Sequence, residues 1–131
     1  MQQSIDGIVR YIIPGNPIPL ARPRLVGKIV YDSQKKLKRK IWELLILLHG
    51  NNPQYEGALH LSIVFFMKKP KGKKLENWHQ KRPDLSNMIK FYEDVASGII
   101  FKDDAQIAKI TASKVYDNVP RVEFTITSLN E

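Results

Sequence analysis

The alternation of side chains from Leu59 to Met67 constrains the fold more than any other feature of this sequence. Leu61, Ile63 and Phe65 fall on one side of an extended chain, and a mixture of polar and apolar residues falls on the other. A strand with one apolar face has to pack that face against another layer of secondary structure. The pattern therefore predicts a sheet with one buried face.

A basic, amphipathic helix is predicted from Ser33, as its N-cap, to about His49, with Gly50 ending it. Its core-facing residues recur at helical spacing: Leu37, Ile41, Leu44, Leu45 and Leu48. Trp42, Ile46 and Leu47 make the apolar surface wider than one stripe. Two interpretations stay open, a core helix with a solvated charged face, or the same helix with an additional subunit contact through Trp42 and Ile46.

The other predicted elements mix strands and helices along the chain. A second helix is expected from Asp84 to about Ser97, between Pro83 and Gly98. Strands are expected at residues 8–13, 26–31 (with Gly27 near its turn), 107–116 and 121–129. The chain has no internal repeat and no low-complexity linker. Residues 1–131 are therefore predicted to form one α+β domain with two main helices and a mixed or antiparallel sheet.

Charge and cysteine content narrow the functional classes. The net charge of +8 favours a polyanionic partner. Nucleic acid is the usual one, although an anionic membrane surface, or a protein that is merely basic, is also compatible with the charge. The absence of cysteine excludes disulfides and thiolate metal sites and suits a reducing cytoplasm. The longest apolar run, Leu44–Leu48, is too short to span a bilayer, so no membrane association is expected.

Carboxylates gather around the second predicted helix of an otherwise basic chain: Asp84, Glu93, Asp94, Asp103 and Asp104. Oxygen ligands of this kind hold Mg²⁺, which takes one or two carboxylates and keeps several waters. Such an ion activates a water molecule and neutralises charge on a scissile phosphate. A nearby lysine, here Lys90, can stabilise the same charge. The pattern is typical of a metal-dependent phosphodiesterase.

Each of these residues also has a purely structural interpretation. Asp84 suits the N-cap of the second helix. Asp103 and Asp104 suit a turn. Lys90 and Glu93 suit a solvated helix face. From residue types and spacing alone, a metal-dependent nuclease is one hypothesis among several.

Two blocks of sequence carry a further signal. The first reads Asp84-Leu85-Ser86-Asn87-Met88, then Lys90, Asp94 and Asp103-Asp104-Ala105-Gln106. The second lies nearer the N-terminus and reads Pro17-Ile18-Pro19, Arg22-Pro23-Arg24 and Tyr31, followed by a basic helix. Together, in order and at matching spacing over most of the chain, the blocks resemble the RusA family of Holliday junction resolvases.

This resemblance implies a function and a site. The implied function is a Mg²⁺-dependent endonuclease, with Mn²⁺ as a substitute ion, that cuts two strands of branched, four-way DNA symmetrically. It would act as a homodimer in a bacterial or phage-infected cytoplasm and need no small-molecule cofactor. Asp84 matches the family's first essential acid, Asp104 its last and Lys90 its catalytic lysine. Asp103 is an additional candidate metal ligand.

One position departs from the family pattern, because Ser86 stands where the family has its second acid. Serine is a neutral, weak metal ligand, so one negative charge is missing. Glu93 lies seven residues further along the same predicted helix face, and its side chain leans back toward the helix N-terminus. We therefore expect Glu93 to supply the third carboxylate. The alternative is a degraded metal site in a dimer that binds branched DNA without cutting it.

Basic residues outside the predicted site are candidates for contact with the DNA backbone. Two lie in the proline-rich loop and six in the segment before the second helix: Arg22, Arg24, Lys69, Lys71, Lys73, Lys74, Lys81 and Arg82. Contacts of this kind position nucleic acid without reading its sequence, and they weaken steeply as salt rises. A solubilising loop is the alternative interpretation of the second group.

Overall fold

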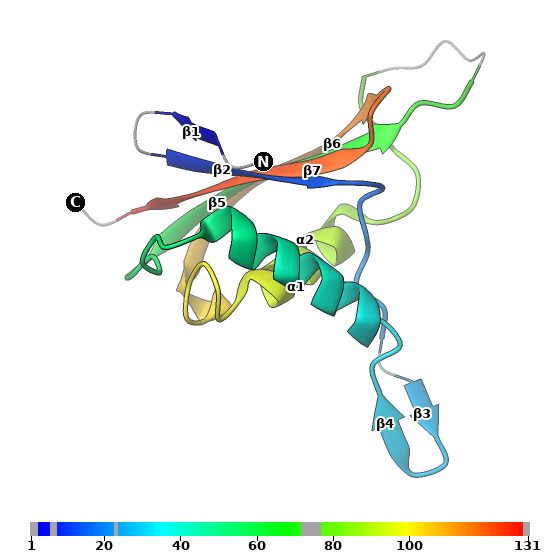
Figure 1. The fold of residues 1–131 in the computed structure, drawn as a ribbon. Helices are drawn as coiled ribbons and strands as arrows, with labels where there is room; N and C mark the ends of the chain where they lie inside the picture. The colour runs from blue at the N-terminus through cyan, green and yellow to red at the C-terminus, as the bar shows by residue number, and fades with distance from the viewer. Residues whose placement is uncertain (1–2, 6–7, 23, 72–76, 130–131) are drawn as a thin grey trace.

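A mixed, five-stranded sheet forms the centre of the computed structural model, which describes residues 3–5, 8–22, 24–71 and 77–129 (Figure 1). The strands lie in the order β1 (Gln3–Ile5), β2 (Ile8–Pro14), β7 (Arg121–Ser128), β5 (Leu59–Lys68) and β6 (Ile107–Asp117). β6 runs parallel to β5, and the other neighbouring strands are antiparallel. The predicted α+β class with a mixed sheet is therefore confirmed.

Two helices, α1 (Lys35–His49) and α2 (Leu85–Ala96), lie on the same side of this sheet (Figure 1). The alternation on β5 explains why, because Leu61, Ile63 and Phe65 are buried in one apolar cluster with residues of both helices. Removing such surface from water stabilises the fold by roughly 25 cal/mol per Å². Within the described residues, no helix has the length and apolar character that crossing a membrane requires.

The segment expected to be one strand at residues 26–31 is instead a hairpin, β3 (Arg24–Val26) paired with β4 (Ile29–Tyr31). Gly27 permits the chain reversal because it adopts a φ of +62°, which other residues rarely adopt. The single-strand prediction was wrong because every residue around the turn is compatible with a strand, apart from Gly27 itself. The hairpin projects away from the sheet and the helices (Figure 1).

The start of α1 also differs from the prediction. Gln34, rather than Ser33, occupies the N-cap position. The reason is a local turn in which Asp32 Oδ1 accepts a hydrogen bond of 2.8 Å from the backbone N–H of Gln34. The Gln34 side chain then reaches outward, donating to the Pro19 carbonyl at 2.8 Å and accepting from the Ala21 N–H at 2.9 Å. These bonds attach the proline-rich loop to the start of α1.

The basic segment between β5 and α2 was expected to contact DNA or to be a solubilising loop, and the structure describes it on either side of residues 72–76. Lys73 and Lys74 lie outside the described residues. Further along, the chain follows the edge of β6, where the His79 N–H donates to the Lys114 carbonyl at 3.1 Å. Lys114 Nζ in turn donates to the Lys81 carbonyl at 2.6 Å. The last part of the segment is therefore docked against the sheet as it enters α2.

Candidate active site

A cleft of about 270 Å³ opens where the proline-rich loop, the start of α1 and the middle of α2 meet the short 3₁₀ turn η1 (Asp104–Gln106). Four carboxylates and two lysines line it, beside Leu20 and Ala21: Asp32, Glu93, Asp94, Asp104, Lys38 and Lys90. When all six groups are ionised, four negative and two positive charges leave a net charge of minus two. The cleft is therefore acidic on a protein whose net charge is +8.

Hydrogen bonds fix the proline-rich loop at the rim of this cleft. The Ile18 N–H donates to the Tyr92 hydroxyl at 3.1 Å, and the Leu20 N–H donates to the Asn87 carbonyl of α2 at 3.0 Å. Tyr92 is buried, and burial raises its pKa to about 12, so the hydroxyl stays protonated at neutral pH. The loop therefore forms a fixed wall of the cleft up to Ala21.

Lys38 joins two sides of the cleft. Its Nζ lies 2.6 Å from Asp32 Oδ2 and 3.2 Å from Asp94 Oδ2. The hydrogen bond from Lys38 lowers the pKa of Asp32, so this carboxylate stays ionised. Sequence reasoning missed both Lys38 and Asp32, because they belong to a run of charged residues with no distinctive spacing. Asp94 could be singled out from the sequence, because it matches the aspartate that lies four positions after the lysine in the family pattern.

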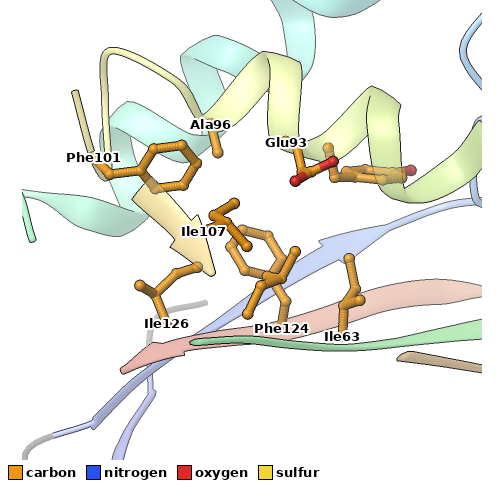
Figure 2. A pocket seen from close by; sticks show the side chains of 9 residues that line it. Ile63, Glu93, Ala96, Phe101, Ile107, Phe124 and Ile126 are labelled. Atoms are coloured by element: carbon orange, nitrogen blue, oxygen red, sulfur yellow. The ribbon is translucent and has the colours of Figure 1, made fainter. Parts of the chain in front are cut away.

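Glu93 and Asp104 lie close enough to repel each other electrostatically. Glu93 is half-buried, and it also borders a small apolar cavity of about 10 Å³ between α2 and the sheet (Figure 2). Burial raises the pKa of Glu93, and the charge of Asp104 raises it further, whereas Lys90 opposes both effects. Burial also raises the pKa of Asp104, with help from Asp103 and Asp94. A bound cation would relieve this repulsion.

Asp103 holds the turn that presents Asp104. Its Oδ1 accepts a hydrogen bond of 3.0 Å from the Ala105 N–H, and its own N–H donates to Gln106 Oε1 at 3.1 Å. The Asp103 side chain also accepts from the backbone N–H of Gln106, and this bond and the one to the Gln106 side chain form a capping box at the start of η1. The turn interpretation of Asp103 therefore describes the structure, and its role as a metal ligand stays a prediction.

Asp84 occupies the N-cap position of α2, yet its side chain forms no capping hydrogen bond. Asp84 is exposed, and it is not one of the described residues that line the cleft. Lys90, the other residue of the first block with a predicted catalytic role, does line the cleft. The structure thus brings Lys90, Glu93 and Asp104 together, while an ion shared by Asp84 and Asp104 stays a prediction.

The carboxylate oxygens of the cleft are the kind of ligand that Mg²⁺ prefers, but they do not make up a full set of protein ligands. In the part of the chain that the structure describes, no three His, Asp or Glu side chains are grouped so as to hold a metal ion. Mg²⁺ in proteins takes one or two carboxylates and fills its other positions with water and phosphate oxygens. Glu93 and Asp104 supply that number, and their repulsion is what a cation would compensate. The residues present therefore fit an ion held by two carboxylates.

The described basic residues that were predicted to contact DNA are exposed: Arg22, Lys69, Lys71, Lys81 and Arg82. Arg22 directly follows Ala21, which lines the cleft, so its backbone is anchored at the rim. Arg24 begins β3, and its side chain lies outside the described part of the structure. Exposure makes these cations available to a polyanion, and their contact with DNA stays a prediction.

Comparison with known proteins identifies a family that this chain matches over most of its length. Residues 14–127 match the family model described as endodeoxyribonuclease RusA. The chain is 36% identical to the crossover junction endodeoxyribonuclease rusA of Lactococcus phage r1t, and the match spans 54% of this chain and 55% of that protein. It is 25% identical to the uncharacterized protein YqaN of Bacillus subtilis (strain 168), over 93% of this chain and 97% of that protein. The match to the phage nuclease therefore covers about half the length of each protein.

Proposed function

The chain belongs to the RusA family of endodeoxyribonucleases, and we propose that it is a structure-selective endonuclease that resolves four-way DNA junctions. The observation that carries this proposal is the acidic cleft on a basic protein, because all six charged residues of the cleft fall within the matched residues. A protein that only binds DNA gains nothing from four carboxylates beside phosphates, since like charges repel. The phage relative is named for the same reaction.

In this proposal Glu93 and Asp104 hold a Mg²⁺ ion, for which Mn²⁺ can substitute, and Asp84 is the further acid that the family pattern implies. The ion would supply an activated water and neutralise charge on the scissile phosphate. Lys90, in the same cleft, stabilises negative charge that develops on the phosphate oxygens. Asp103 keeps the turn of Asp104 in place through its capping box.

The positive surface outside the cleft binds the DNA backbone in this proposal. Arg22 is the best placed of the candidates, because its loop is bonded both to α1 through Gln34 and to α2 through Leu20. Replacing Arg22 with Gln should weaken junction binding about equally for all sequences. The slope of log affinity against log salt should also fall by about one unit.

We also propose that the active form is a homodimer. A four-way junction presents two related strands for cutting, and an isologous dimer places two copies of one cleft about a two-fold axis. Paired cuts then follow from the symmetry of the protein rather than from two separate encounters. A single protomer would instead be expected to release singly nicked junctions.

The test is incubation of the full chain with a synthetic, immobile four-way junction, with and without Mg²⁺. Paired, symmetric nicks that require the metal are expected. A linear duplex with the sequence of one arm is the matched control substrate, and Asp104→Asn is the variant expected to bind without cutting. Glu43→Gln, an exposed acid on α1 outside the cleft lining, is the matched control variant.

Two outcomes would contradict the proposal. Equal cutting of the duplex control would mean that the enzyme does not select branched DNA. Tight junction binding with no cutting in either Mg²⁺ or Mn²⁺ would support the alternative, a non-catalytic branched-DNA-binding dimer whose metal site is degraded at Ser86.

A further inference from the structure

The β3–β4 hairpin carries large apolar side chains that its own chain leaves uncovered. Leu25, Val26, Ile29 and Val30 are 69%, 59%, 70% and 65% exposed, and Tyr31 is 42% exposed. Together they present on the order of 500 Å² of apolar surface, which is at the upper end for the largest patch on a soluble monomer. The hairpin projects from the body of the molecule, so this surface stands clear of the sheet and the helices (Figure 1).

The apolar residues lie on both faces of the hairpin. Leu25 is the cross-strand partner of Val30, and Val26 is the partner of Ile29. Successive pairs along a hairpin face opposite sides, so each face carries one aliphatic pair. A two-stranded hairpin, here with strands of three residues, is at best marginally stable in water by itself. A partner that stabilises it has to enclose it rather than touch one face.

A second uncovered apolar surface lies on α1, which begins four residues after the hairpin ends. Trp42, Ile46 and Leu47 are 44%, 42% and 77% exposed. Trp42 and Ile46 are four residues apart and therefore adjacent on the helix surface. Beside Trp42, a groove of about 330 Å³ runs between α1 and α2, with Val95 in its wall. The widened apolar stripe predicted from the sequence thus borders a concave surface.

We propose that this hairpin inserts against the α1–α2 groove of a second copy of the chain, while the second copy's hairpin does the same in return. The chain supplies both parts of such a contact, an apolar projection and a groove in which Trp42 and Val95 lie among the charged side chains of Lys35, Lys38, Arg39 and Asp94. Their combined exposed area approaches the roughly 800 Å² that each partner contributes to a stable interface. DNA is a poorer occupant, because aliphatic side chains on both hairpin faces match the core of a protein interface and not a phosphate backbone.

The position of the hairpin connects this interface to the cleft. The hairpin lies between Ala21 and Asp32, both of which line the cleft, so the subunit contact begins at the cleft rim. Docking of the hairpin would hold the loop of Arg22 from both ends. The inference names the partner surface of the homodimer in the proposed function, and it rests on that part of the proposal.

The test is the molar mass of the full chain, by sedimentation velocity and light scattering. The wild type should behave as a dimer of its 15.1 kDa chain. The double variant Leu25→Ser/Ile29→Ser, with one change on each hairpin face, and the variant Ile46→Ser should both shift to monomer. Val119→Ser is the matched control, because Val119 is 62% exposed in the β6–β7 connection, and it should stay dimeric.

Cross-linking gives a second readout that does not depend on loss of the dimer. The chain has no cysteine, so Ile29→Cys and Ile46→Cys each introduce a single thiol. A mixture of the two variants, exchanged and treated with a short bis-maleimide, should yield a cross-linked species joining one chain of each kind. Circular dichroism of all variants checks that the substituted chains remain folded.

A monomeric wild type overturns the inference, and so does a dimer that survives both the hairpin and the Ile46→Ser changes. A hairpin variant that stays dimeric but loses junction affinity overturns it as well and assigns the hairpin to DNA. The junction-cutting assay is read separately. If the chain forms dimers that depend on the hairpin but does not cut junctions with metal, the interface is upheld and the nuclease is rejected. If the chain is a monomer that cuts junctions, the nuclease is upheld and the interface is rejected.

Discussion

Lys38 Nζ lies 3.2 Å from Asp94 Oδ2, so a residue of α1 is paired with a residue of α2 at the acidic cleft. The same ammonium group is 2.6 Å from Asp32 Oδ2, at the end of the hairpin segment. One lysine therefore balances two of the four cleft carboxylates. The remaining two, Glu93 and Asp104, repel each other electrostatically, and they are the pair that would hold the cation in the proposed function.

Replacing Lys38 with Met should lower the rate of junction cutting by about 10- to 100-fold, because a shift of about 1 Å in a catalytic group costs that much. The free energy of unfolding should change by less than about 1 kcal/mol, since both ion pairs are partly exposed. Single-turnover cutting and urea unfolding measure the two effects. Lys38→Arg should recover most of the rate, and Lys40→Met, at an exposed position of α1, is the control.

A wild-type rate in Lys38→Met would show that the bridge has no part in the reaction. A parallel loss of rate and of stability, unrelieved in Lys38→Arg, would mean that Lys38 serves the fold alone.

Glu93→Gln should raise the Mg²⁺ concentration needed for half-maximal cutting by about tenfold or more, in the range seen when groups that support a metal site are removed. The substitution keeps the shape of the side chain and removes its charge. A titration of cutting rate against Mg²⁺ measures the effect, with Glu43→Gln as the control. An unchanged titration would remove Glu93 from the metal site and reject its role as the replacement for the acid missing at Ser86.

Substitutions of Asp84 and Asp103 should have opposite effects, because Asp84 is proposed to act in cutting and Asp103 caps the turn that begins at Asp104. Asp84 makes no capping hydrogen bond, so Asp84→Ala should leave the free energy of unfolding within about 0.5 kcal/mol of the wild type while cutting falls sharply. Asp103→Ala removes the bond to Ala105 and should cost about 1 kcal/mol. Chemical unfolding and junction cutting of both variants decide. Full activity in Asp84→Ala would contradict its assignment as an essential acid.

Periodic segments of this sequence could be predicted because their pattern is local. The β5 alternation places Leu61 and Phe65 in the core, and the helical spacing of α1 places Leu45 there. The hairpin turn at Gly27 was misjudged, because one glycine in a short apolar run is compatible with either a strand or a reversal. The contacts of Lys38 were out of reach, because its pairing with Asp94 depends on how two helices pack and not on any local repeat.

Stability should fall as the pH drops below about 6.5, because His49 is buried in the core beside Tyr11, with the Tyr11 hydroxyl 2.6 Å from His49 Nδ1. Burial lowers the pKa of His49, although the backbone at Pro53 and Asn52 partly opposes this. Between the lowered pKa and the ordinary value, the unfolded chain binds more protons than the folded chain. The free energy of unfolding therefore increases with pH in that window and levels off above it.

Urea unfolding at pH 7.5 and 5.5 measures the difference in the free energy of unfolding between the two pH values, which His49→Gln should reduce. An unchanged difference in His49→Gln would assign the effect to other groups, of which His79, whose pKa burial also lowers, is the first to test.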